Sequence, residues 1–121
     1  ELTVLNAGHP RPLLIRNGSV HTLDFDPAAP VGLGFVEAEV THIRLEPGDA
    51  VLVLSDGVIE ARSAGGDIFG AERVGDLAVR ALAGGESIPE TVRRLIHSVL
   101  THRGIGLEDD ATLLLLRWDG T

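Results

Sequence analysis

The feature that most constrains the fold is an apolar run that does not alternate with polar residues. Residues 50–55 read AVLVLS and lead directly into Asp56 and Gly57. A strand with one face in water alternates apolar and polar side chains, whereas a continuous apolar run is typical of a strand buried on both faces. The sequence therefore predicts a sheet with a doubly covered strand, and a carboxylate where that strand ends.

A second apolar run has its acidic residues before it rather than after it. Asp109 and Asp110 precede residues 111–118, which read ATLLLLRW and predict a last buried strand. If the two strands are antiparallel neighbours, the end of the first lies beside the start of the second. Asp56, Asp109 and Asp110 are then expected to converge at one edge of the sheet.

Three convergent carboxylates repel one another unless protons or a cation neutralise them. Hard divalent cations such as Mg²⁺ or Mn²⁺ prefer sites of this all-oxygen kind. Gly57 allows the backbone to turn sharply beside such an ion. The alternative is that Asp56 and Gly57 form an ordinary turn and that Asp109 and Asp110 lie in a solvated loop. The residues alone leave both interpretations open.

The rest of the chain predicts an α+β fold in which two helices cover antiparallel β-sheets. Asn17–Gly18 is a two-residue hairpin signal, and Ser87 with Glu90 matches a capping box at the start of a helix. Gly84 and Gly85 are expected to end the preceding helix. Strands are expected at residues 2–6, 13–16, 19–25, 37–45, 50–55 and 111–118, and helices at 71–83 and from 87 to about 103.

Composition narrows the class of partner. The chain has 121 residues, of which 44% are hydrophobic, and this predicts one small domain or part of one. Its net charge of -8 disfavours nucleic acid and anionic membranes as partners and suits a cation. It has no cysteine, and no apolar run approaches the length of about 18 residues that a membrane span needs. We therefore expect a cytoplasmic protein without a membrane span or a signal peptide.

Six motifs in order carry a resemblance to a known family. They resemble the C-terminal half of a metal-dependent protein serine/threonine phosphatase of the PPM (type 2C) superfamily, and more narrowly the bacterial stage II sporulation E group. The resemblance extends from about Leu2 to Arg117. Its motifs are LNAGHPRPLLIR, PVGLG, LEPGDAVLVLSDG, LSDGVIEAR, GGDIFG and EDDATLLLL.

The resemblance implies half of a sandwich of two antiparallel sheets with helices outside, and a two-metal Mn²⁺ or Mg²⁺ centre at one end. In that family the metals activate a water that attacks phosphoserine or phosphothreonine. Carried over by motif, Asp56 and Asp109 are metal ligands, whereas Asp110 stands where many relatives have Asn. Gly57 supports the turn beside the ion.

Two further residues have a possible supporting role. His9, in AGHP, could contact phosphate or metal, and the alternative is that it braces the turn. Glu60 could be a ligand, and the alternative is that it makes local hydrogen bonds.

The family's first metal motif, an Asp in a Gly-Asp-x-x-Gly-x-Gly context, is not found in these residues. Asp49 and Asp67 both follow glycine but are interpreted as turns. Residues 1–121 are therefore expected to be the C-terminal part of a single phosphatase domain, inactive alone and self-associating through open sheet edges. The expected substrate is a phosphorylated protein, an anti-anti-sigma-type regulator. The alternative is a non-catalytic pseudo-phosphatase or protein-binding module.

Overall fold

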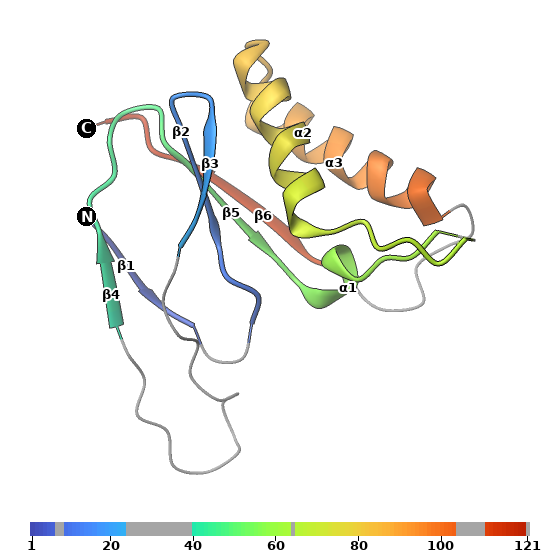
Figure 1. The fold of residues 1–121 in the computed structure, drawn as a ribbon. Helices are drawn as coiled ribbons and strands as arrows, with labels where there is room; N and C mark the ends of the chain where they lie inside the picture. Colours follow the sequence, from blue (N-terminus) through green and yellow to red (C-terminus); the bar gives the residue numbers. More distant parts are fainter. Residues whose placement is uncertain (7–8, 24–39, 64, 104–110, 121) are drawn as a thin grey trace, which may run out of the picture.

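The computed structural model describes residues 1–6, 9–23, 40–63, 65–103 and 111–120 (Figure 1). Within these residues it has the antiparallel strands and the two long helices that the sequence predicts. One short helix, α1, is added where a turn was expected. The elements are β1 (Leu2–Leu5), β2 (Leu13–Arg16), β3 (Ser19–Thr22), β4 (Val40–Ile43), β5 (Ala50–Leu54), α1 (Asp56–Ile59), α2 (Ala71–Ala83), α3 (Ile88–Arg103) and β6 (Leu113–Arg117).

The strands form two antiparallel sheets. The larger has the order β3-β2-β5-β6, and β1 pairs with β4 in a separate two-stranded sheet. The β2–β3 hairpin turns at Asn17 and Gly18, whose φ angles of 50° and 75° are both positive. A two-residue turn of this kind matches the right-handed twist of its strands. The hairpin signal in the sequence is therefore confirmed.

The main core lies between one face of the larger sheet and the helical layer. Figure 1 shows α2 and α3 packed side by side over this sheet. Leu52 on β5 and Leu95 on α3 belong to this core and are almost completely buried, with exposed fractions of 0% and 1%. The same cluster contains Leu13, Ile15, Leu54, Val58, Phe69, Val74, Ala78, Val99 and Leu115. Side chains alternate across a strand, so these residues mark the face that the helices cover.

The opposite face of the sheet is only partly covered, and this corrects one expectation. Val51 on β5 is buried, as a doubly covered strand requires, but β6 is not buried on both faces. Leu115 is 6% exposed, whereas Leu114 and Leu116 are 50% and 47% exposed. β6 is the outermost strand of its sheet, and its even-numbered residues alternate away from the helices. We call the exposed side chains of Leu114, Leu116 and Trp118 the open face.

The helix ends follow their sequence signals with one difference. Gly84 and Gly85 end α2, and Gly85 has a φ of 81°. The Ser87 hydroxyl accepts a hydrogen bond from the Glu90 amide at 3.3 Å, as a capping box requires. The Glu90 carboxylate pairs instead with Arg93. Among the described helices, none is both long and apolar enough to cross a membrane.

Candidate functional site

The candidate site begins where β5 ends and α1 starts. β5 ends at Leu54, and Asp56 occupies the first turn of α1. An acidic side chain is favoured there because the N-terminal end of a helix carries partial positive charge. The Asp56 side chain is exposed, and it has no hydrogen bond or ion pair within the part of the chain that the structure describes. None of the described residues therefore occupies its lone pairs.

The turn beside Asp56 is helical. Gly57 lies within α1 and is not among the residues with positive φ, so the sharp turn expected there is made without left-handed backbone. The Glu60 amide donates to the Asp56 carbonyl oxygen at 2.8 Å and ends the helix. The Glu60 side chain itself is exposed. Its backbone thus makes a local hydrogen bond, while a ligand role for its carboxylate stays a prediction.

The end of β5 lies beside the start of β6, as the two apolar runs predict. Leu54 pairs with Leu113, and the Ser55 amide donates to the Thr112 carbonyl oxygen at 2.9 Å. The Thr112 amide in turn donates to the Ser55 hydroxyl at 2.7 Å. Asp109 and Asp110 lie outside the described residues, so the convergence of the three carboxylates stays a prediction.

The turn that contains His9 is held by a residue that the sequence reasoning missed. Asn6, which is 6% exposed, donates through its amide to the His9 carbonyl oxygen and accepts from the His9 amide, both at 2.9 Å. The His9 ring is exposed. The Asn6 side chain therefore holds this turn, rather than the His9 side chain. The sequence signal that could have identified Asn6 is an asparagine three residues before the turn residue that it bonds.

Asp49, at the other end of β5, is committed to an ion pair. Its side chain is 3% exposed, and its two oxygens accept hydrogen bonds from Arg16 at 2.5 to 3.1 Å. The Glu46 amide donates to the same carboxylate at 2.7 Å. The hydrogen bonds from Arg16 hold the pKa of Asp49 below its usual value, although burial opposes this shift. The prediction that Gly48–Asp49 belongs to a turn is confirmed.

Asp67 also belongs to a turn. Its amide donates to the Ser63 hydroxyl at 3.2 Å, and its carbonyl oxygen is 2.8 Å from Nε2 of His102. Within the described ranges, no group of three or more His, Asp or Glu side chains is placed to hold a metal ion. Of the three aspartates that the sequence predicts to be metal ligands, Asp56 is the one that lies among the described residues. As an exposed carboxylate without a partner there, it is the donor that Mn²⁺ or Mg²⁺ prefers.

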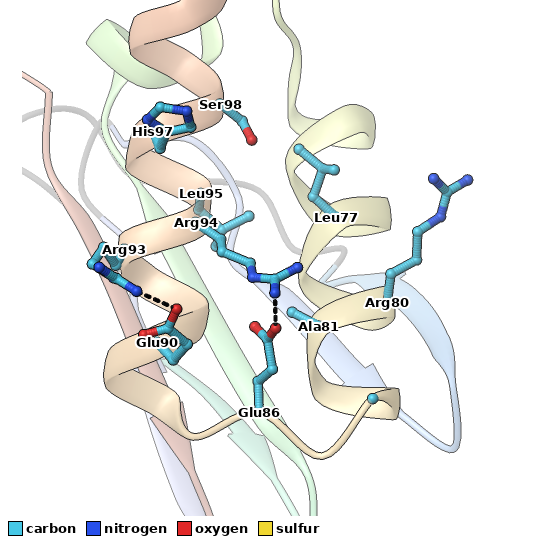
Figure 2. Close-up of a pocket in the computed structure, with 11 residues that line it drawn as sticks. Leu77, Arg80, Ala81, Glu86, Glu90, Arg93, Arg94, Leu95, His97 and Ser98 are labelled. Carbon is cyan, nitrogen blue, oxygen red and sulfur yellow. Dashed lines mark hydrogen bonds and ion pairs between the residues drawn. The ribbon is translucent and has the colours of Figure 1, made fainter.

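A groove of about 710 Å³ lies between α2 and α3, away from Asp56. Figure 2 shows Leu77, Ala81 and Leu95 between the helices, and two ion pairs at the rim. These pairs are Arg94 with Glu86 and Arg93 with Glu90. The groove is lined by none of the predicted site residues, and the rim carboxylates are neutralised by arginines rather than left for a cation.

Comparison with known proteins gives a match to one family. The description of that family is Stage II sporulation protein E (SpoIIE), and the match covers residues 1–119. No curated protein sequence matches the chain significantly.

Several solved structures of bacterial proteins are similar to this chain. The RsbU and RsbW domains of Rv1364c from Mycobacterium tuberculosis are 31% identical over 98% of this chain and 33% of that one, with a TM-score of 0.71. The SiaA-PP2C domain of Pseudomonas aeruginosa is 21% identical over 90% and 43% of the two chains, with a TM-score of 0.71. The SpoIIE phosphatase domain of Bacillus subtilis is 23% identical over 98% and 51%, with a TM-score of 0.62.

The chain therefore spans between 33% and 51% of the length of these three structures. Two of the three share less than 25% identity with it and show the fold alone. The family match, by contrast, covers nearly the whole chain and includes the residues around Asp56. The chain belongs to the stage II sporulation protein E family.

Proposed function

We propose that residues 1–121 are the C-terminal part of a metal-dependent protein serine/threonine phosphatase domain. The observation that supports this proposal is the pairing of Ser55 with Thr112, which joins the residue before Asp56 to the residue before β6. The family membership supports the same conclusion, because structurally similar members are phosphatase domains.

We further propose that Asp56, Asp109 and Asp110 hold Mn²⁺ or Mg²⁺, with Asp110 the weaker contributor. When bound, such ions supply an activated water and stabilise the phosphoryl oxygens. The chain's own contribution is negative charge at a fixed position. The strand end and α1 fix the backbone of Asp56, so the position of its Cα is set before an ion arrives. The solved SpoIIE phosphatase domain is described as presoaked with Mn, which supports this choice of metal.

The proposed substrate is a phosphorylated serine or threonine in a cytoplasmic protein, of the anti-anti-sigma type that the family resemblance implies. Two observations support a protein substrate. The net charge of -8 disfavours nucleic acid. In addition, the Mycobacterium tuberculosis protein contains an RsbU domain together with an RsbW domain, so this fold occurs there beside a second protein module.

The test uses the protein that contains the complete phosphatase domain, which we call the parent protein. It measures phosphate release by the parent protein from a phosphorylated protein of this type, with and without Mn²⁺. Asp109→Asn should reduce Mn²⁺-dependent turnover by roughly 100-fold or more, because it removes charge that holds the ion. Asp110→Asn should reduce it less, since many relatives carry Asn at that position. Turnover in the parent that is absent even with Mn²⁺, while the phosphoprotein still binds, would establish the non-catalytic binding module instead.

We also propose that the isolated 121-residue chain self-associates and lacks activity. The open face exposes Leu114, Leu116 and Trp118, and β6 is an outermost strand with one edge unpaired within the described sheet. Unpaired edges and apolar faces recruit other chains, most simply as a two-fold dimer. Light scattering of the isolated chain should show the dimer. A stable monomer at tens of micromolar, or substantial hydrolysis of p-nitrophenyl phosphate with Mn²⁺, contradicts this proposal.

A further inference from the structure

Ser55 uses its amide, its carbonyl oxygen and its hydroxyl to bond backbone groups at the junction between β5 and α1. Its amide continues the sheet by donating to the Thr112 carbonyl oxygen at 2.9 Å. Its carbonyl oxygen has left the sheet and accepts the first hydrogen bond of α1, from the Val58 amide at 3.1 Å. Its hydroxyl accepts from the Thr112 amide at 2.7 Å. One residue therefore belongs to the strand and to the helix at once.

The hydroxyl takes the place of the missing carbonyl in the sheet. In an antiparallel ladder, every second residue pair exchanges two backbone hydrogen bonds. Ser55 and Thr112 stand at such a position, where the Thr112 amide would normally donate to the Ser55 carbonyl. That carbonyl is occupied by α1, so without the hydroxyl the Thr112 amide loses its acceptor in the protein. Serine at the start of a helix usually caps the helix with its side chain. Here Ser55 makes no such capping bond, which shows that its hydroxyl serves the sheet instead.

We propose that Ser55 is a positioning residue for the metal centre, which locks the backbone that carries Asp56 to the first residues of β6. This inference rests on the proposed function, because Asp56 acts as a ligand there. The two locked backbones lead in sequence to Asp56 on one side and to Asp110 and Asp109 on the other. Ser55 itself contacts neither ion nor substrate in this proposal.

The expected effect of losing the hydroxyl is weaker metal binding. In Ser55→Ala, the Thr112 amide either stays without a protein acceptor or regains one through opening of the first turn of α1. The first outcome removes a bond between the two backbones, and the second displaces Asp56. In both cases we expect the spacing between Asp56 and β6 to become less fixed. Residues that orient metal ligands typically change metal affinity by about 10- to 100-fold when substituted. The dissociation constant for Mn²⁺ should rise within that range, while kcat at saturating Mn²⁺ should fall by a smaller factor.

The experiment compares variants in the parent protein. Ser55→Ala removes the hydroxyl, Ser55→Thr retains it, and Ser87→Ala is the matched control. Ser87 also accepts one hydrogen bond from a backbone amide, that of Glu90, but it does so at the start of α3. The readouts are Mn²⁺ affinity by titration calorimetry, exchange of the Thr112 amide by NMR, and thermal stability.

The proposal expects Ser55→Ala to weaken Mn²⁺ binding and to speed Thr112 exchange, Ser55→Thr to restore both, and Ser87→Ala to change stability alone. Wild-type Mn²⁺ affinity in Ser55→Ala, or equal weakening in Ser87→Ala, overturns it. If Ser55→Ala does not fold, Ser55→Cys replaces it, because sulfur is a weak acceptor of similar size. Wild-type affinity in Ser55→Cys then overturns the proposal.

Asp56→Asn separates this inference from the proposed function. If Asp56→Asn binds Mn²⁺ as the wild type does, the assignment of Asp56 as a ligand is overturned. The positioning role of Ser55 is then overturned as well, because it depends on that assignment. If Asp56→Asn weakens binding but Ser55→Ala does not, only the positioning role of Ser55 is overturned.

Discussion

The two ends of β5 each carry an aspartate next to a glycine, yet their surroundings differ completely. Asp49, before the strand, is 3% exposed and accepts hydrogen bonds from Arg16 and from the Glu46 amide. Asp56, after the strand, is exposed and has no side-chain partner among the described residues. A carboxylate whose oxygens are already occupied cannot hold a cation, whereas an unpaired one can. One end of the strand therefore uses its carboxylate for stability, whereas the carboxylate at the other end is the one that we propose as a metal ligand.

The difference also shows how each end is kept in shape. At the Asp49 end the carboxylate itself joins β2, the turn and β5, so the side chain is part of the framework. At the Asp56 end the framework consists of backbone hydrogen bonds and the Ser55 hydroxyl, and the carboxylate is not used. At that end, the residue that fixes the backbone differs from the residue that we propose as the charged ligand. This separation allows a carboxylate to stay free while its backbone is fixed.

The largest expected effect is that of Asp56→Asn on catalysis. It keeps the shape of the side chain but removes its charge, so Mn²⁺-dependent turnover of the parent protein should fall by roughly 100-fold or more. Thermal stability should change little, because substitutions of exposed residues without partners usually stay within about 0.5 kcal/mol. Asp76→Asn, at an exposed position on α2, is the matched control and should keep full turnover. Near wild-type turnover in Asp56→Asn would sink the assignment of this end as the binding end.

The next effect is on stability, at the other end of the strand. Arg16→Met removes the partner of Asp49 and leaves a buried carboxylate unpaired, which should lower the free energy of unfolding by about 2–3 kcal/mol. Mn²⁺ affinity of the folded protein should stay at the wild-type value. Denaturant titration measures the first and calorimetry the second.

Arg80→Met is the control for this substitution. Arg80 is exposed and has no ion pair within the described part of the chain. Its loss should cost less than about 1 kcal/mol. A loss of stability in Arg16→Met no larger than that in Arg80→Met shows that the ion pair at Asp49 is not a structural anchor.

The smallest effect is a difference in acid sensitivity. The folded-state pKa of Asp49 is lowered from the reference value of 3.8, mainly by its hydrogen bonds to Arg16. Its contribution to stability is therefore complete above the reference pKa, and it is lost as the pH falls through the lower folded-state value. Asp49→Asn should flatten the fall in stability below about pH 4. Glu90, whose pKa Arg93 also lowers, contributes equally to both proteins. Identical acid profiles for wild type and Asp49→Asn would contradict the prediction.

Much of the fold could be predicted because its signals are local. Asn17–Gly18, the capping serine at Ser87 and the glycines after α2 each act within a few residues, and each element formed where its pattern indicated. The exposure of β6 could not be predicted in this way. A run of leucines has the same sequence whether it is central or outermost, and the order of strands decides which residues are covered.

The site was predictable in part for the same reason. The position of Asp56 after a buried strand follows from the apolar run, and the structure confirms that β6 starts beside the end of that strand. The roles of Asn6 and Ser55 depend on which backbone groups lie opposite their side chains, and no periodic pattern encodes that. The pairing of Asp49 with Arg16 joins residues 33 positions apart and has no local signature.

The hydrogen bond between Ser55 and Thr112 joins residues 57 positions apart, with α2 and α3 between them. Closing so long a loop costs more chain entropy than closing the two-residue turn of the β2–β3 hairpin. Contacts of high sequence separation form late and slow the folding of a domain. The edge that carries Asp56 is therefore expected to be completed after the hairpin and the helices. A substitution that slows the docking of α2 or α3 would delay the formation of the proposed metal site during folding, even though it changes none of the proposed ligands.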